Sequence, residues 1–256
     1  MAKLEIHQFP CLSDNYGVLV CDAEAGVVAS IDAPDAGAVT RALADKGWRL
    51  THILTTHHHG DHTTGNLALK AETKCTVIGP RGEASKVPGI DRAVGEGDTF
   101  MLGGHEVRVL DTPGHTAGHV SYWIPSAGVA FVGDTLFAIG CGRVIEGDAQ
   151  TMWGSLRKLM ALPPETTVYC GHEYTQANAR FALTIEPDNA ALQQRAREVD
   201  ALRAAGRPTL PTTMAIELET NPFLRPHVAA IQQRLGMAGK PEWQIFGEIR
   251  ERKNRS

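Results

Sequence analysis

The sequence contains no stretch of about 18 consecutive apolar residues, which is the length that a membrane-spanning helix needs. Its first residues, Met-Ala-Lys-Leu-Glu-Ile-His, also lack the basic region and following apolar run of a secretory leader. We therefore expect no membrane partner and a cytoplasmic location.

Cysteine is scarce and scattered. No Cys-x-x-Cys pair occurs, and the number of cysteines is odd, which argues against a disulfide framework. Their positions are 11, 21, 75, 141 and 170. Unpaired thiols of this kind fit a reducing compartment.

The chain has no surplus of positive charge. It has 25 Lys and Arg residues against 29 Asp and Glu residues, and the net charge is −4. Only the extreme C-terminus is locally basic, and no basic stretch is interleaved with aromatic residues. A nucleic-acid partner is therefore not expected.

The length of 256 residues and the 43% hydrophobic content suit one large domain, or one domain with a smaller appendage. Apolar runs and turn signals predict strands at 3–8, 16–21, 26–32, 50–55, 75–79, 98–111 (a hairpin), 119–124, 128–133 and 167–170. Helical patterns are expected at 35–46, 63–72, 149–161, 175–184, 188–205, 226–235 and 241–253, and loops at 80–97. Because strands are no longer predicted from about residue 175, we predict an α/β catalytic domain at 1–173 and a helical substrate-binding domain at 174–256.

Four potential metal ligands lie in the motif His57-x-His59-x-Asp61-His62, directly after the strand expected at 50–55. Imidazoles and carboxylates this dense are poor material for a core and are costly to hold together without a cation. The alternative interpretation is a solvated polar loop. We predict that the motif supplies part of a metal centre.

Three further candidates, His115, Asp134 and His172, each follow a short apolar run that predicts a strand. Loops at strand ends on a rigid sheet are where sites are commonly built, so these loops can converge on one rim. Metal ions about 3.5–4 Å apart can share a hydroxide, because metal binding lowers the pKa of water toward about 7. We assign His57, His59 and His115 to one ion, Asp61, His62 and His172 to the other, and Asp134 to the bridge.

The other histidines have more ordinary interpretations. His58 is the middle of the triplet and is expected to point away from its neighbours. His119 is expected to support the metal ligands from outside rather than to bind metal. Cys141 and Cys170 have no base paired with them. Ordinary surface or hydrogen-bonding roles are expected for His7, His52, His105 and His227.

The motif resembles the signature of the metallo-β-lactamase superfamily. Further matches narrow the resemblance to the glyoxalase II (hydroxyacylglutathione hydrolase) family over nearly the whole chain. They are Gly114-His115, Gly133-Asp134-Thr135-Leu136-Phe137, Gly140-Cys141-Gly142-Arg143, Glu146-Gly147, Cys170-Gly171-His172-Glu173-Tyr174-Thr175 and Thr220-Asn221-Pro222-Phe223-Leu224-Arg225. The resemblance implies a four-layer αββα sandwich with a small C-terminal helical domain that covers the substrate site. It also implies hydrolysis of S-D-lactoylglutathione to D-lactate and glutathione, a step of methylglyoxal detoxification, with the seven ligands assigned above.

The same resemblance implies that Arg143, Tyr174, Arg250 and Lys253 contact the glutathione moiety. Arg250 and Lys253 are three residues apart, so on a helix they share a face and can hold a carboxylate. Their alternative interpretation is a solvated basic tail. Some members of the family have a tyrosine where this chain has Ile145, which removes one hydroxyl contact.

We therefore predict a thioester hydrolase with two divalent metal ions, zinc first and iron or manganese also compatible. Asp61 and Asp134, with a metal-bridging hydroxide, are its predicted catalytic residues. We expect a monomer that acts on a small glutathione thioester. The alternatives are a sulfur oxygenase with one iron, a nuclease on the same fold, and a metal-binding protein without catalysis.

Overall fold

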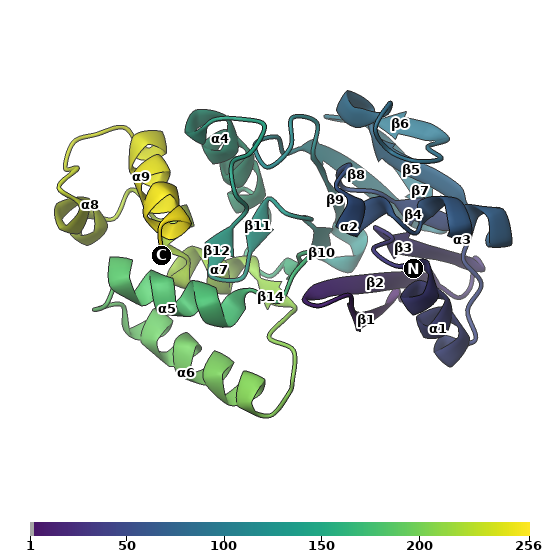
Figure 1. Cartoon of the computed structure of the whole chain (residues 1–256), viewed down its shortest axis with the longest axis horizontal. Coiled ribbons are helices and arrows are strands. Elements are labelled where there is room, and N and C mark those ends of the chain that lie inside the picture. Colours follow the sequence, from purple (N-terminus) through teal and green to yellow (C-terminus); the bar gives the residue numbers. More distant parts are fainter. Residues whose placement is uncertain (1–2) are drawn as a thin grey trace. The chain divides into compact units, whose positions relative to one another are not determined.

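The computed structural model describes residues 3–256, which group into two compact units. The first unit runs up to Asp111 and resumes at Thr116–Gly133. The second unit comprises Thr112–His115 and Asp134–Ser256. Figure 1 labels the elements of both units.

The first unit is built on a mixed sheet in the order β1-β2-β3-β4-β5-β6. Its strands are β1 (Glu5–Cys11), β2 (Asn15–Asp22), β3 (Val27–Ile31), β4 (His52–Leu54), β5 (Thr76–Pro80) and β6 (Arg92–Val94). The first three pair antiparallel, and β3 to β6 pair parallel. Parallel neighbours need crossover connections, which here contain α1 (Ala36–Lys46), α2 (Gly60–Thr63) with α3 (Asn66–Thr73), and η1 (Arg81–Glu83).

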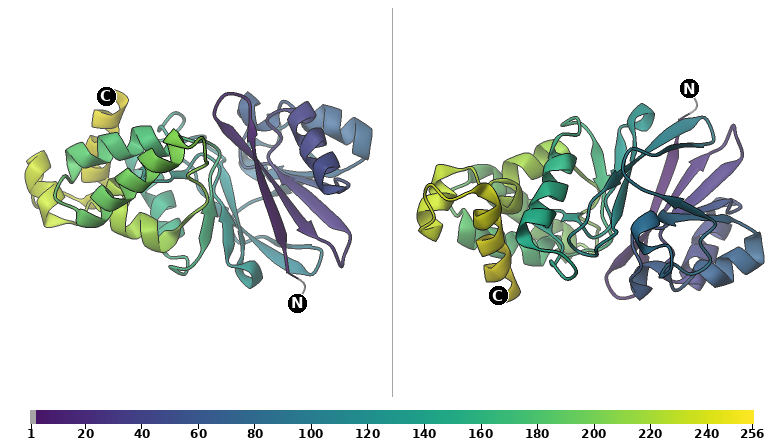
Figure 2. Two further views of the ribbon diagram at one scale, coloured as in Figure 1. Left: turned by 90° about the horizontal axis from the view of Figure 1, so that it is seen from below. Right: turned by 90° about the horizontal axis from the view of Figure 1, so that it is seen from above.

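Helices α1 and α3 cover one face of this sheet (Figure 2). Leu19 and Ile53 from the strands pack in one buried cluster with Val39 of α1 and Leu69 of α3. The Asp35 side chain caps the start of α1 by accepting a hydrogen bond from the Ala38 amide at 2.7 Å. The core therefore fixes the carboxyl ends of the parallel strands, where the histidine motif begins.

A second, antiparallel set of strands in the first unit runs in the order β7-β8-β9-β10. Its strands are β7 (Thr99–Leu102), β8 (His105–Asp111), β9 (Val120–Ile124) and β10 (Val129–Phe131), with η2 (Pro125–Ala127) between the last two. The fully buried Tyr122 of β9 donates a hydrogen bond to the Thr55 carbonyl at 2.7 Å. This bond ties the second set of strands to the loop that follows β4.

The second unit holds short strands and most of the helices. Its elements are β11 (Leu136–Phe137), β12 (Gly140–Cys141), α4 (Ala149–Met160), β13 (Thr167–Tyr169), α5 (Thr175–Ile185), α6 (Ala190–Ala204), β14 (Thr212–Thr213), α7 (Met214–Thr220), η3 (Pro222–Leu224), α8 (Ala229–Leu235) and α9 (Glu242–Asn254). Helices α5 and α6 lie side by side (Figures 1 and 2) and bury Ile139 among their small and apolar residues. Trp153 of α4 stacks on Phe246 of α9, with ring centroids 6.0 Å apart.

The structure differs from the sequence expectations mainly in short elements. Strand β6 lies within the segment 80–97, which was expected to be loop, because pairing with β5 makes three residues extended. The β11–β12 hairpin and helix α7 were not expected at all. Elements of two to seven residues are too short to show a clear hydrophobic period, so the sequence pattern did not predict them.

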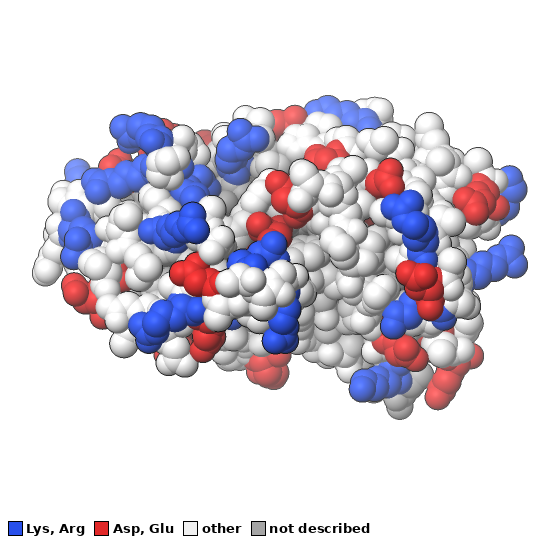
Figure 3. Space-filling model, turned by 60° about the horizontal axis from the view of Figure 1, so that its bottom comes forward, with Lys and Arg blue, Asp and Glu red and all other residues white. Residues whose placement is uncertain are grey.

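No helix in the described part of the chain, residues 3–256, combines the length and apolar content needed to cross a membrane. Basic and acidic side chains are interspersed on the face that Figure 3 shows. The small net charge of −4 thus comes from nearly equal numbers of basic and acidic residues.

The cluster under α1 and α3 should dominate the stability of the first unit. We expect Ile53→Ala to lower the free energy of unfolding by about 2–5 kcal/mol, because Ile53 is fully buried in the middle of the sheet. Met101→Ala, at a side chain that is 59% exposed, should change it by less than about 0.5 kcal/mol. Urea unfolding followed by circular dichroism measures both values, and equal losses would contradict this description of the core.

Candidate metal centre

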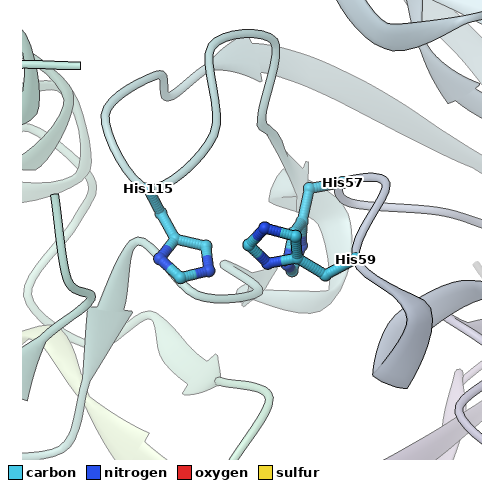
Figure 4. Close-up of side chains that lie close together, drawn as sticks. All are labelled: His57, His59 and His115. Atoms are coloured by element: carbon cyan, nitrogen blue, oxygen red, sulfur yellow. The ribbon is translucent and has the colours of Figure 1, made fainter. Parts of the chain in front are cut away.

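The first unit places His57 and His59 side by side, directly after β4 (Figure 4). His57 Nε2 lies 3.1 Å from His59 Nδ1. Two nitrogens bound to one tetrahedral zinc at about 2.0–2.1 Å lie about 3.3 Å apart. The separation of these ring nitrogens therefore fits a pair that chelates one metal ion.

Asp32, at the end of β3, determines which ring nitrogen of His57 and of His62 carries a hydrogen. Its Oδ1 accepts the Thr56 amide at 2.7 Å, and its Oδ2 accepts the Thr56 hydroxyl at 2.8 Å. Oδ2 also lies 2.8 Å from Nδ1 of His62, which must donate to it. Because the Thr56 hydroxyl hydrogen points to Asp32, the oxygen can only accept from His57 Nδ1, 3.0 Å away. Both Nε2 atoms are therefore left with lone pairs suited to a metal.

Asp61 and His62 form a second pair on the short helix α2. His62 Nε2 lies 3.7 Å from Asp61 Oδ2. Asn15 Nδ2 donates to the Asp61 backbone carbonyl at 3.1 Å and to its Oδ2 at 3.3 Å. This side-chain amide orients the carboxylate, which is about half exposed.

Two neighbouring histidines have supporting contacts in the same unit. His58 lies against the buried Glu83, whose Oε2 accepts the His58 amide and lies 2.8 Å from His58 Nδ1. The ring of His119 stacks near that of His57, with centroids 4.9 Å apart. His58 is thus directed to Glu83, and the supporting role expected for His119 stays a prediction.

The second unit brings His115, Asp134 and His172 together. Asp134 Oδ2 lies 3.5 Å from His115 Nε2 and 3.3 Å from His172 Nε2. All three residues are buried. Imidazole nitrogen and carboxylate oxygen are both metal-binding atoms, and the bridging role expected for Asp134 stays a prediction.

His115 and His172 each have a neighbour that fixes the orientation of the imidazole ring. His115 Nδ1 donates to the Arg143 carbonyl at 2.9 Å, which leaves its Nε2 to face Asp134. The ring of His172 stacks on Tyr174 with centroids 4.8 Å apart and an interplanar angle of 1°. The Phe137 ring makes edge contacts with the rings of both His172 and Tyr174.

Among the described residues, these His and Asp clusters fit a binuclear metal site. Imidazole nitrogen and carboxylate oxygen suit zinc, iron and manganese alike, so the donor set does not distinguish these metals.

The basic pair expected near the C-terminus lies on α9. Arg250 is buried, donates from Nη1 to the Cys141 carbonyl at 2.9 Å, and lies over the Phe223 ring. Lys253 is half-buried and donates to the Ala177 carbonyl at 3.2 Å. Burial and the neighbouring Arg250 charge lower the pKa of Lys253. A frayed, solvated tail would show none of these contacts.

The remaining expected substrate residues are accessible. Arg143 and Ile145 are exposed after β12, and Tyr174 is partly exposed beside His172. Cys141 is buried, and burial raises the pKa of its thiol to about 11. The neutral thiol of Cys141 is therefore unsuited to act as a nucleophile at neutral pH.

Asp32 and Asn15 are absent from the residues that the sequence singled out. Asp32 could have been found, because it ends an apolar strand just as the candidate ligands do. Asn15 had no comparable signal, since its bond to Asp61 spans 46 residues.

Comparisons with known proteins place these features in a family. Residues 21–172 match the model of the metallo-β-lactamase superfamily, and residues 173–256 match the model of the hydroxyacylglutathione hydrolase C-terminus. Hydroxyacylglutathione hydrolase of Brucella anthropi (strain ATCC 49188) is 58% identical over 98% of this chain and 97% of its own. That of Brucella ovis is 57% identical over 98% of both chains.

Solved structures agree with this assignment. The crystal structure of ETHE1 from Myxococcus xanthus aligns with a TM-score of 0.70 and 30% identity, over 98% of this chain and 91% of that one. The structure of TTHA1623 in a di-iron-bound form aligns with a TM-score of 0.60 and 25% identity, over 85% and 98%. The predicted fold class is confirmed, because a metallo-β-lactamase fold is followed by a helical C-terminal domain. The chain belongs to the hydroxyacylglutathione hydrolases (glyoxalase II) of the metallo-β-lactamase superfamily, enzymes that hydrolyse thioesters of glutathione.

Proposed function

We propose that this enzyme hydrolyses S-D-lactoylglutathione and related 2-hydroxyacylglutathiones at two metal ions held by the seven predicted ligands. The observation that carries the proposal is the position of Asp134 Oδ2 between the Nε2 atoms of His115 and His172. One ion would be held by His57, His59 and His115, the other by Asp61, His62 and His172, and Asp134 would bridge them.

The His57–His59 and Asp61–His62 pairs support this division, because the two candidate ligand atoms of each pair lie close together, at 3.1 and 3.7 Å. When bound, the metal ions supply a hydroxide at neutral pH and polarise the thioester carbonyl. Asp32 and the Arg143 carbonyl keep the ring nitrogens of the ligands in the required protonation state. Asp61, oriented by Asn15, orients the attacking oxygen.

The glutathione moiety is proposed to bind the second unit. Arg250 and Lys253 share one face of α9, and their two positive charges suit the glycine carboxylate of glutathione. Arg143 and Tyr174 lie beside the His115 and His172 ligands and would contact the thiol end. Ile145 offers no hydroxyl there, so this contact would be apolar.

We further propose zinc as the native metal, with iron and manganese compatible; the di-iron form of TTHA1623 supports iron as a candidate. The five cysteines are all free and buried, which fits a cytoplasmic location.

We propose a monomer with a catalytic domain at 1–173 and a substrate-binding domain at 174–256. The two family models meet at residues 172 and 173, which supports this boundary.

Removal of the metal should abolish the activity. We expect chelator-treated protein to lose turnover of S-D-lactoylglutathione and to regain it with two equivalents of zinc, iron or manganese. Elemental analysis beside a thioester hydrolysis assay measures both quantities. Full turnover without metal would refute the proposed function, and a single iron per chain would favour the one-iron oxygenase alternative.

Asp32 should matter through the ligands that it orients. We expect Asp32→Asn to weaken metal binding and lower kcat by about 10–100-fold. In either orientation of the new side chain its amide nitrogen would face a hydrogen, either that of the Thr56 amide or those of the Thr56 hydroxyl and His62 Nδ1. Asp22→Asn is the matched control, since Asp22 is a buried carboxylate that accepts from the Gly104 and Ala25 amides. Metal titration of both variants measures the effect, and equal affinities would remove Asp32 from this role.

Substrate binding should weaken at alkaline pH. Because its pKa is lowered, Lys253 loses its proton at a lower pH than an exposed lysine. The dissociation constant of a non-hydrolysable S-alkylglutathione should therefore rise as pH increases through that pKa. Lys253→Arg stays charged and should move the rise to higher pH. Calorimetry across pH measures this, and a Lys253→Ala variant with the wild-type profile would show that Lys253 does not bind the ligand.

A further inference from the structure

The turn of the β11–β12 hairpin has a strained backbone. Ile139 adopts a φ of 56°, in the left-handed region that a β-branched residue rarely occupies. Its side chain is fully buried between α5 and α6. A conformation of this kind persists only where the surrounding structure holds it in place.

Both ends of this hairpin meet the candidate metal ligands of the second unit. Asp134 precedes β11, and Arg143, whose carbonyl accepts from His115, follows β12. The Gly142 amide donates to the Thr135 carbonyl at 3.2 Å. A Cβ on Gly142 would lie 1.9 Å from the Asp134 carbonyl, so the two ends are packed backbone to backbone. A shift of the hairpin therefore moves both Asp134 and the acceptor of His115.

A buried carboxylate from α7 holds the turn. Glu217 is fully buried, and its Oε2 accepts the Ile139 amide at 2.7 Å. The same oxygen accepts from Asn221 Nδ2 at 3.0 Å, and Oε1 accepts the Thr212 hydroxyl at 2.7 Å. Burial raises the pKa of the Glu217 carboxyl. Burying a carboxyl group costs free energy. If α7 only covered the core, an apolar side chain at position 217 would serve better than a glutamate.

Two amide side chains complete the contact with the hairpin. Asn221 Nδ2 donates to the Gly140 carbonyl at 2.9 Å and to the Phe137 carbonyl at 3.3 Å. Asn178 Nδ2 donates to the Ala138 carbonyl at 3.1 Å. The backbone of the turn is thus bonded at four successive residues, by side chains from α5, α7 and the residue that precedes η3.

We propose that Glu217, together with Asn221 and Asn178, is a positioning residue that holds the strained β11–β12 hairpin so that Asp134 and His115 keep their metal-binding geometry. The helical part of the chain then serves the metal centre as well as the substrate. This inference rests on the proposed metal site.

The test compares Glu217→Ala, Glu217→Gln and Glu186→Ala in the full-length protein. Glu186 is the matched control, because it is also a buried carboxylate of the second unit and accepts from Arg225 at 2.8 and 3.0 Å, away from the hairpin. In Glu217→Gln the amide oxygen can still accept from Ile139, while Thr212 can accept from the new amide nitrogen. Zinc affinity, kcat, KM and the melting temperature are measured for each variant.

We expect Glu217→Ala to weaken zinc binding and lower kcat by about 10–100-fold, with a smaller change in KM. Glu217→Gln should restore both quantities to within a few-fold of wild type. Glu186→Ala should lose thermal stability but keep wild-type zinc affinity and kcat. A folded Glu217→Ala with wild-type zinc affinity and kcat would overturn the proposal.

If Glu217→Ala does not fold, Asn178→Ala decides, because it removes only the bond to Ala138. Its zinc affinity and kcat should fall in the same direction, and unchanged values would overturn the proposal. A wild-type protein that binds no zinc and hydrolyses no thioester would instead refute the proposed function, so the two failures are distinguishable.

Discussion

One buried carboxylate, Asp32, determines which ring nitrogen of His57 and of His62 carries a hydrogen. It accepts directly from His62 Nδ1 and, through the Thr56 hydroxyl, makes that oxygen an acceptor for His57 Nδ1. Imidazole binds a metal only through a nitrogen without hydrogen, so these bonds make Nε2 the candidate metal-binding atom of both rings. In the second unit the Arg143 carbonyl does the same for His115. The orientation of these three candidate ligand rings thus depends on hydrogen bonds to their Nδ1 atoms.

The scaffold explains why these bonds form. Asp32 and the motif follow β3 and β4, which are parallel neighbours, so both reach the same edge of the sheet. The core under α1 and α3 holds that edge. The other candidate ligands lie in the second unit, at Thr112–His115, before the β11–β12 hairpin and after β13. The strained turn of that hairpin is hydrogen-bonded by side chains that follow it by up to 84 residues in sequence.

The sequence predicted the strand–loop pattern that presents the ligands, because apolar runs followed by Gly, Pro, Thr or His are local signals. Arg250 and Lys253 were predicted from the family resemblance, because their spacing on a helix alone fits a solvated basic tail equally well. Glu217 and Asn15 were not found, since their partners are distant in the chain and their roles follow from tertiary contacts. The turn at Ile139 was missed for a related reason, because isoleucine signals a strand rather than a left-handed turn.

The central claim is that the Asp134 carboxylate is shared by two metal ions. Anomalous-difference maps from crystals of the metal-loaded enzyme test it most directly. We predict two peaks about 3.5–4 Å apart, with an Asp134 oxygen bound to both. A single peak at full occupancy, or an Asp134 carboxylate bound to neither ion, would contradict it.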